Sequence, residues 1–214
     1  MNGRGAAADR IRGLYGIVDL RAGTAESLLP LADALLAGGT GVLQLRAKSA
    51  PAREILDAAR ALRTKTREAG ALLVLNDRLD LALACGADGV HVGQDDLPAV
   101  RVRAAAPPEF LVGLSTHSPE QAGAAGDEVD YIGYGPIFPT GTKADAEAAR
   151  GIDSLAMVTD ASRLPVVAIG GLEEAHAHEI ARAGAAAMAM IGAAERAPDA
   201  SALARRIGEV FRDR

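Results

Sequence analysis

Short apolar runs alternate with amphipathic segments along almost the whole chain. The runs are about five residues long and rich in Val, Ile, Leu and Ala, as buried parallel strands are. In the segments between them, Leu and Ala recur at the spacing of a buried helix face. The predicted strands are residues 14–19, 41–45, 72–75, 89–92, 110–114, 129–133, 165–169 and 187–191. The predicted helices are residues 25–37, 52–69, 79–84, 97–105, 119–125, 152–160, 173–183 and 199–211.

Eight strands that alternate with eight helices indicate a (β/α)8 barrel. The turns are short, so each helix must fold straight back over the sheet and leave the strands parallel. Gly70, Gly86 and Gly184 stand where a helix should stop and a strand begin, which suits a left-handed helix cap. A solenoid would show the same alternation. The units differ in length and follow no fixed period, which favours the barrel.

The length and composition of the chain agree with a single α/β domain, a TIM barrel. A chain of 214 residues is long enough for one such barrel. Hydrophobic residues make up 49% of the chain but aromatic residues only 3%, so the core must be built from small aliphatic side chains. We expect a flexible N-terminal arm, residues 1–10, and a catalytic barrel domain, residues 11–214.

Charge and hydropathy exclude several kinds of partner. A net charge of -5 argues against a general nucleic-acid surface, although a local basic pocket remains compatible with it. No apolar run approaches the ~18 residues of a membrane helix, and the N-terminal segment has no apolar signal core. The single cysteine, Cys85, cannot form an intramolecular disulfide. We therefore expect a cytoplasmic protein without a membrane or nucleic-acid partner; a homo-oligomer is compatible with the sequence.

Polar residues gather at the predicted carboxyl ends of the strands, where barrel enzymes have their active sites. Each of them alone is better explained as a surface charge or a helix cap, and Asp77 and Asp96 could simply begin the helices that follow them. Their joint placement on seven units favours one shared site. The set consists of Arg46, Lys48, Asn76, Asp77, Asp96, Ser115, Thr140 to Lys143, Gly171 and Gly192.

The stretch from Tyr131 to Lys143, YIGYGPIFPTGTK, is central to this site. Its glycines and prolines end a strand in an irregular loop. Thr140, Thr142 and Lys143 then supply two hydroxyl groups and an ammonium group, which suit phosphate oxygens. A solvated surface turn would look the same in isolation, so the functional interpretation depends on the other strand ends.

Two anionic subsites follow from residue type. Asp77 and Asp96 offer hard oxygen ligands for magnesium, Mg²⁺, whose coordination phosphate oxygens and water would complete. The positive charges of Arg46, Lys48 and Lys143 beside such a metal suit a diphosphate better than a single phosphate, for example as a leaving group. A second phosphorylated substrate would bind the backbone of Gly170-Gly171 and Ile191-Gly192, after the seventh and eighth strands.

The histidines give weaker indications. His91 lies within a predicted strand, and a hydrogen-bonded structural role inside the barrel explains it best. His117 follows Ser115 closely enough to reach the mouth of the barrel, but a solvated loop residue is an equal alternative. His176 and His178 lie on a polar helix face. We assign no chemistry to His91, His176 and His178, and the role of His117 stays open.

At these residues the sequence resembles thiamine phosphate synthase. The matching motifs span nearly the whole chain in the order of that family and are specific as a set. They are LQLRAKS (43–49), VLNDR (74–78), DGVHVGQDDLP (88–98), GLSTHS (113–118), DYIGYGPIFPTGTK (130–143) and AIGGL (168–172). The resemblance implies a transferase that joins an aminopyrimidine methyl diphosphate to a thiazole phosphate, giving thiamine phosphate and diphosphate with magnesium.

The resemblance also implies roles for individual residues. Asp77 and Asp96 would bind magnesium, and Ser115 would contact the reacting pyrimidine. Catalytic roles fall to Arg46, Lys48, Ser115 and Lys143. The pyrimidine diphosphate would be bound by Gln44, Arg46, Lys48, Asn76, Ser115 and Lys143, and the thiazole phosphate by Thr140, Thr142, Gly171, Ile191 and Gly192.

Two positions depart from the family pattern. Ala47 stands where the family often has an acidic residue, and Gly192 where it often has serine, so a hydroxyl contact to phosphate would be lost. Two other functions are alternatives to the synthase for this sequence. A thiazole tautomerase is a similar barrel without the diphosphate and metal chemistry, and a non-catalytic phosphate-ligand sensor would not need Asp77 and Asp96. The full polar set favours the synthase.

Overall fold

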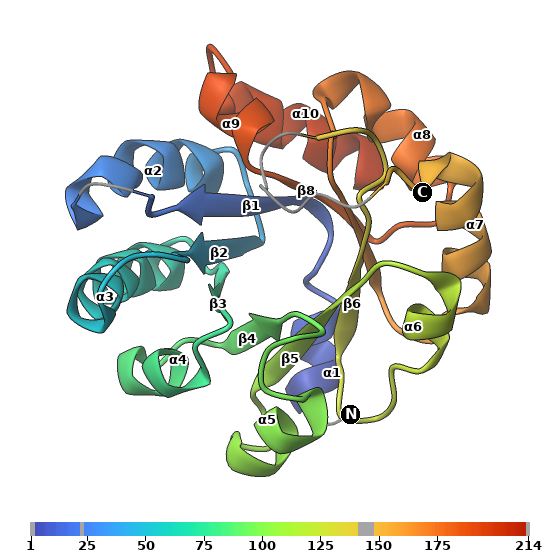
Figure 1. Cartoon of the computed structure of the whole chain (residues 1–214). Helices are drawn as coiled ribbons and strands as arrows, with labels where there is room; N and C mark the ends of the chain where they lie inside the picture. The colour runs from blue at the N-terminus through green and yellow to red at the C-terminus, as the bar shows by residue number, and fades with distance from the viewer. Residues whose placement is uncertain (1–2, 22–23, 141–147, 213–214) are drawn as a thin grey trace.

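A computed structural model describes residues 3–21, 24–140 and 148–212. Eight parallel strands close into a barrel in chain order, with β8 paired to β1 (Figure 1). Their bounds differ from the predicted ones by at most two residues, and the predicted (β/α)8 barrel is confirmed. The strands are β1 (Gly13–Asp19), β2 (Val42–Arg46), β3 (Leu72–Asn76), β4 (Gly89–Val92), β5 (Leu111–Thr116), β6 (Tyr131–Tyr134), β7 (Val166–Ile169) and β8 (Ala187–Met190).

Helices surround the barrel on the outside (Figure 1). The two elements that the sequence did not predict are α1 and α9. Gly70, Gly86 and Gly184 have φ of 66°, 65° and 96°, so the predicted left-handed helix ends are confirmed. The helices are α1 (Gly3–Ala8), η1 (Ala25–Leu28), α2 (Leu29–Ala37), α3 (Ala52–Glu68), α4 (Leu79–Cys85), α5 (Ala99–Ala105), α6 (Pro119–Gly123), α7 (Gly151–Ala161), η2 (Glu174–His176), α8 (Ala177–Arg182), α9 (Gly192–Arg196) and α10 (Ala200–Arg212). Among the described residues, no helix has the length and apolar character to cross a membrane.

Strand residues alternate between two hydrophobic cores. Side chains of successive strand residues point to opposite faces, so every second residue faces the barrel axis and the others face the helices. The outer core, between strands and helices, is the larger one. The inner core lies inside the barrel and includes Tyr15, Ile17, Val42, Leu72, Val74, Leu111, Tyr131, Val167, Ala187, Ala189 and Ile191.

Helix α1 lies at the amino-terminal end of the barrel, behind the strands in Figure 1. Ala8 at its end and Ile11 after it are buried and pack against the inner core. The expected flexible arm, residues 1–10, therefore contains a helix that the sequence pattern did not indicate; how far this arm moves stays a prediction. Packing at this end leaves the carboxyl ends of the strands as the open face.

Two aspartates at the amino-terminal end of the barrel are neutralised in the same way. Asp88, just before β4, accepts hydrogen bonds from Arg63 at 2.6 and 2.9 Å and from the backbone N–H of Leu73 in β3 at 2.8 Å. Asp130, just before β6, pairs with Arg103 and accepts the N–H of Val112 in β5 at 2.8 Å. Each carboxylate thus ties a helix to the start of a strand.

Candidate active site

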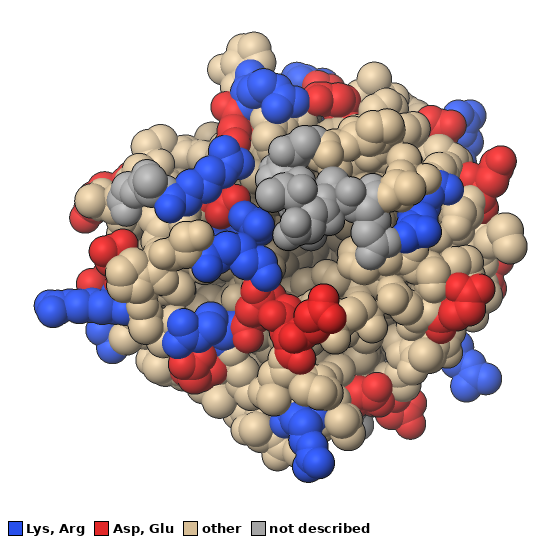
Figure 2. Space-filling model, viewed as in Figure 1, with Lys and Arg blue, Asp and Glu red and all other residues tan. Residues whose placement is uncertain are grey.

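A cleft of about 960 Å³ opens at the carboxyl ends of the strands. Figure 2, from the same direction as Figure 1, shows basic and acidic side chains on adjoining parts of this face near its centre. The predicted convergence of polar residues at this end is confirmed for most of the set; Thr142 and Lys143 lie outside the described residues. The predicted site residues that line the cleft are Arg46, Lys48, Asn76, Asp77, Asp96, Ser115, Thr140, Gly171, Ile191 and Gly192.

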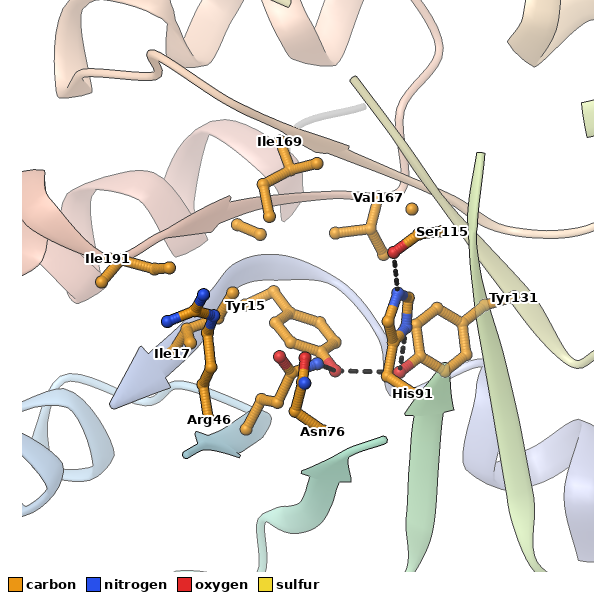
Figure 3. A pocket seen from close by; sticks show the side chains of 13 residues that line it. Tyr15, Ile17, Arg46, Asn76, His91, Ser115, Tyr131, Val167, Ile169 and Ile191 are labelled. Carbon is orange, nitrogen blue, oxygen red and sulfur yellow. Dashed lines mark hydrogen bonds between the residues drawn. The ribbon is translucent and has the colours of Figure 1, made fainter. Parts of the chain in front are cut away.

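A smaller pocket of about 40 Å³ continues from the cleft into the barrel. Arg46, Asn76 and Ser115 line both spaces and form the border between them. Gln44, which is buried, lines only the inner pocket, together with Tyr15 and other inner-facing side chains (Figure 3). The predicted binding residue Gln44 therefore lies one layer deeper than the other site residues.

The two aspartates lie together at the ends of β3 and β4. Asp77 has φ of 62°, a left-handed conformation that aspartate tolerates better than most residues, and its N–H donates to the carbonyl of His91 at 2.8 Å. Asp96 accepts the N–H of Gly93 at 2.7 Å. Neither caps a helix, because Arg78 and Pro98 occupy the positions before α4 and α5. The helix-cap alternative for these residues is wrong.

Lys48 and the two carboxylates form one charged group. The Nζ of Lys48 lies 2.6 Å from Oδ2 of Asp77. Burial raises the pKa of Asp77, Lys48 opposes this shift, and a hydrogen bond shared with Asp96 supports it. Burial also acts to raise the pKa of Asp96, but the hydrogen bonds with Asp77 and with the Gly93 N–H lower it overall. Two carboxylates that lie this close together beside Lys48 could face one cation.

Arg46 is oriented by Asp19, a residue to which sequence reasoning gave no role. Oδ2 of Asp19 accepts from Nη1 of Arg46 at 2.6 Å and from Nε of Arg21 at 3.3 Å. The Asp19 side chain is only 2% exposed and that of Arg46 is 16% exposed, so this contact is shielded from solvent. Asp19 is the last residue of β1. Its place at a strand end, like that of the other site residues, was the sequence signal for a role in the site.

Glycine backbone forms part of the opposite wall of the cleft, at Gly170, Gly171 and Gly192. Gly170 and Gly171 have φ of 97° and 65°, a region that favours glycine. A Cβ at Gly171 would come within 2.7 Å of the carbonyl oxygens of Phe138 and Pro139. Gly192 begins the short helix α9 directly after β8. Loops after the last two strands and a short extra helix are where barrels commonly bind phosphate.

Three of the histidines have hydrogen-bond partners: Nδ1 of His176 accepts the N–H of Glu173 at 3.0 Å, and the other two lie at the site. His91 points into the barrel, where Nδ1 lies 3.1 Å from the hydroxyl of Tyr131 and Nε2 lies 2.9 Å from Oγ of Ser115, so the predicted hydrogen-bonded role is confirmed. His117 donates from Nδ1 to the carbonyl of Gly135 at 2.7 Å and lines the cleft. It is half-buried and held in place, unlike a solvated loop residue.

Sequence reasoning also missed Gln94, whose Nε2 donates to the backbone carbonyl of Ser115 at 2.6 Å. Gln94 lies in the turn after β4, between His91 and Asp96 in the sequence. Its contact with Ser115 in β5 depends on the fold of this turn, which the sequence pattern does not give. The tyrosines Tyr15 and Tyr131 were likewise seen only as strand residues, although both line the inner pocket. Their inward direction depends on the register of the strands, which the sequence pattern leaves open by one residue.

Comparisons with known proteins agree with this site. Residues 14–194 match the family described as thiamine monophosphate synthase. Thiamine-phosphate synthase of Laribacter hongkongensis is 45% identical over 86% of this chain and 88% of that protein. Thiamine-phosphate synthase of Moorella thermoacetica is 42% identical over 92% of this chain and 94% of that protein.

Solved structures give the same result. Thiamine phosphate pyrophosphorylase from Pyrococcus furiosus superposes with a TM-score of 0.84 at 32% identity, over 96% of this chain and 98% of that one. A 3-hexulose-6-phosphate synthase, at 18% identity and a TM-score of 0.71, shares the fold alone. The family model matches most of the chain, and relatives named thiamine-phosphate synthase are 42% and 45% identical to it over most of its length. The chain therefore belongs to the thiamine monophosphate synthase family.

Proposed function

We propose that the protein is a thiamine phosphate synthase, which joins an aminopyrimidine methyl diphosphate to a thiazole phosphate and releases diphosphate. The observation that carries this proposal is one cleft with two different walls. Asp77, Asp96, Arg46 and Lys48 form a charged wall on β2 to β4. Glycine backbone after β7 and β8 forms the other wall, as a cleft for two phosphorylated ligands requires. Cytoplasmic location and the number of subunits stay predictions.

The charged wall suits magnesium and a diphosphate. Asp77 and Asp96 are close enough to share a hydrogen bond, so their oxygens could both face one ion. Among the described residues, no group of three or more His, Cys, Asp or Glu could hold a metal. Magnesium is usually held by one or two protein carboxylates, and phosphate oxygens and water occupy its remaining coordination positions. When bound, the ion would neutralise charge on the departing diphosphate.

Arg46 and Lys48 would bind the diphosphate oxygens, with Lys143 as a further proposed cation. Asp19 keeps the Arg46 guanidinium at the border between cleft and inner pocket. Asn76 lines the same border, and Gln44 and Ser115 lie beside it. A pyrimidine ring at this border would place its methylene carbon under the diphosphate. Thr140, Thr142, Gly171, Ile191 and Gly192 would bind the thiazole phosphate across the cleft.

The proposed chemistry requires no protein nucleophile. The bond between the pyrimidine methylene carbon and oxygen breaks, and its electron pair leaves with diphosphate. The amino-substituted ring delocalises the resulting positive charge. The nitrogen lone pair of the thiazole then forms the new C–N bond. The residues of the cleft act by neutralising the leaving group and by holding the two rings in contact.

The alternative functions fit this cleft less well. A thiazole tautomerase would have no use for a carboxylate pair beside Arg46 and Lys48. A phosphate-ligand sensor would not need two carboxylates whose shared burial is unfavourable without a cation. The wall on β2 to β4 therefore supports the synthase.

A product assay tests the proposal. The protein is incubated with both substrates, with magnesium or with a chelator, and thiamine phosphate and diphosphate are quantified. We expect equimolar formation of both products with magnesium and almost none with the chelator. Isomerisation of the thiazole substrate without diphosphate release would instead identify a tautomerase, and binding without any turnover would identify a sensor.

A further inference from the structure

Five polar side chains form a continuous hydrogen-bonded chain across the inside of the barrel, which we call the barrel network (Figure 3). Nε2 of Gln44 donates to the hydroxyl of Tyr15 at 2.9 Å, and the hydroxyls of Tyr15 and Tyr131 lie 2.8 Å apart. Tyr131 contacts Nδ1 of His91 at 3.1 Å, and Nε2 of His91 contacts Ser115 at 2.9 Å. Both ends of the network, Gln44 and Ser115, line the inner pocket.

Two glycines provide the space for this network. A methyl group at Gly113 in β5 would overlap the phenol ring of Tyr131 and the imidazole of His91. At Gly133 in β6, an added Cβ would come within 3.2 Å of Cε1 of His91. Both glycines face the barrel axis, where a larger residue would otherwise add to the inner core. The inside of the barrel is therefore shaped around His91 and Tyr131.

The hydrogen bonds of the network have one direction. Burial raises the pKa of both Tyr15 and Tyr131, so each keeps its hydroxyl proton and has one hydrogen to donate. Tyr15 accepts from the Gln44 amide and donates to Tyr131. Tyr131 in turn donates to Nδ1 of His91. A His91 that accepts at Nδ1 carries its proton on Nε2 and donates it in a hydrogen bond to Ser115.

We propose that Tyr131 and His91 are positioning residues that fix the two ends of the network, so that Ser115 donates and the Gln44 carbonyl accepts at the inner pocket. With its oxygen occupied as acceptor by His91, Ser115 directs its hydroxyl proton toward the pocket. With its amide nitrogen occupied by Tyr15, Gln44 presents Oε1. The network couples the two ends, because reversing one hydrogen bond requires the reversal of all of them.

The two ends of the network, an acceptor on β2 and a donor on β5, suit the polar groups of an aminopyrimidine that lies between them. Its amino group can donate to Oε1 of Gln44, and a ring nitrogen can accept from Ser115. This assignment of ligand groups rests on the proposed function. The direction of the network is a property of the free protein and can be measured independently of any substrate.

Paired tyrosine variants test the positioning role. Tyr131→Phe removes the central hydroxyl of the network, and Tyr134→Phe is the matched control. Tyr134 is buried in the same strand, but its hydroxyl bonds to Ser154 of α7 on the outside of the barrel. We expect Tyr131→Phe to raise KM for the pyrimidine diphosphate by about tenfold and to change KM for the thiazole phosphate by less than about twofold. Equal effects on both substrates, or the same effect in Tyr134→Phe, would overturn the positioning role.

Nitrogen-15 NMR of histidine-labelled wild-type protein tests the direction of the network, with the His91 signal identified by its loss in His91→Gln. We expect a neutral His91 that carries its proton on Nε2, and a mixture of tautomers in Tyr131→Phe. A proton mainly on Nδ1, or a charged ring at neutral pH, would overturn the proposal even if turnover is normal. Absence of product from wild-type protein with a correct tautomer would instead contradict the proposed function alone.

Discussion

Asp88 and Asp130 at the amino-terminal end of the barrel contrast with Asp77 and Asp96 at the other end. The first two are each paired with one arginine and one backbone N–H, and they stand apart from each other. The second two lie beside each other, and the Nζ of Lys48 is 2.6 Å from Oδ2 of Asp77. Full pairing identifies a carboxylate that serves the fold, whereas two adjacent carboxylates with one lysine indicate a place for a ligand.

The largest effect is expected from Asp130→Ala, which leaves the partly buried Arg103 without its carboxylate. We expect the free energy of unfolding to fall by about 3 kcal/mol, because a buried pair is broken from one side. Denaturant unfolding measures this change. The control Asp33→Ala, which removes the exposed partner of Lys65, should cost less than about 1 kcal/mol. Equal losses in both variants would mean that the amino-terminal pairs do not hold the barrel.

At the carboxyl-terminal end of the barrel, a large effect on turnover and a small effect on stability are expected. Asp77→Asn or Asp96→Asn should lower kcat by about 100-fold or more, because a charge that faces the proposed ion is lost. The free energy of unfolding should change by less than about 1 kcal/mol, since the substitution keeps side-chain volume. Asp80→Asn, three residues along the chain and paired with Arg78 on the surface, is the control for turnover. Normal magnesium-dependent turnover in the Asp77 and Asp96 variants would exclude them as ligands.

A moderate effect is expected at Thr140, on the side of the cleft proposed to bind the thiazole phosphate. Thr140→Val removes a neutral hydroxyl at the cleft wall, worth about 0.5 to 1.5 kcal/mol. KM for the thiazole phosphate should therefore rise about two- to tenfold, with little change in kcat. Thr64→Val on the exposed side of α3 serves as the control in steady-state kinetics. A fall in kcat alone would move Thr140 to the diphosphate subsite.

The smallest effect is expected from Gly192→Ser, which introduces the residue that the family often has. Gly192 is the first residue of α9, a position where serine is compatible with the helical backbone, so KM for the thiazole phosphate should fall by up to about twofold. Gly171→Ser offers a contrast across the cleft, because a Cβ there meets backbone carbonyl oxygens. A rise in KM for the Gly192 variant would show that the glycine itself is needed.

Much of the fold was predictable because its signals are local. Each strand is a short apolar run, and each of the caps at Gly70, Gly86 and Gly184 needs only one residue in the left-handed region. The helices α1 and α9, of six and five residues, were missed, whereas α6, also of five residues, was predicted with Pro119 in its first turn. Without a start signal of this kind, so short a helix shows no amphipathic period and depends on tertiary contacts.

The candidate site was predictable to the extent that it depends on strand ends. Arg46 and Asp77 stand at the ends of apolar runs and Asp96 lies four residues after one, so their place at the mouth follows from the barrel alone. Asp19 and Tyr131 could not be assigned in this way. Their roles depend on partners 27 and 40 residues away, Arg46 and His91, and on which face of a strand they occupy. These relations exist only after the barrel has closed.

The packing of Ala8 and Ile11 against the inner core has a consequence for the order of events in a catalytic cycle. The described residues fill that end, and the inner pocket opens to the cleft past Arg46, Asn76 and Ser115. Under the proposed function, a pyrimidine that enters by this route binds before the thiazole phosphate covers it. The joined product then leaves by the same route before the next pyrimidine binds. Helix α1 would thus favour an ordered reaction, although it lies at the opposite end of the barrel from the proposed site of both substrates.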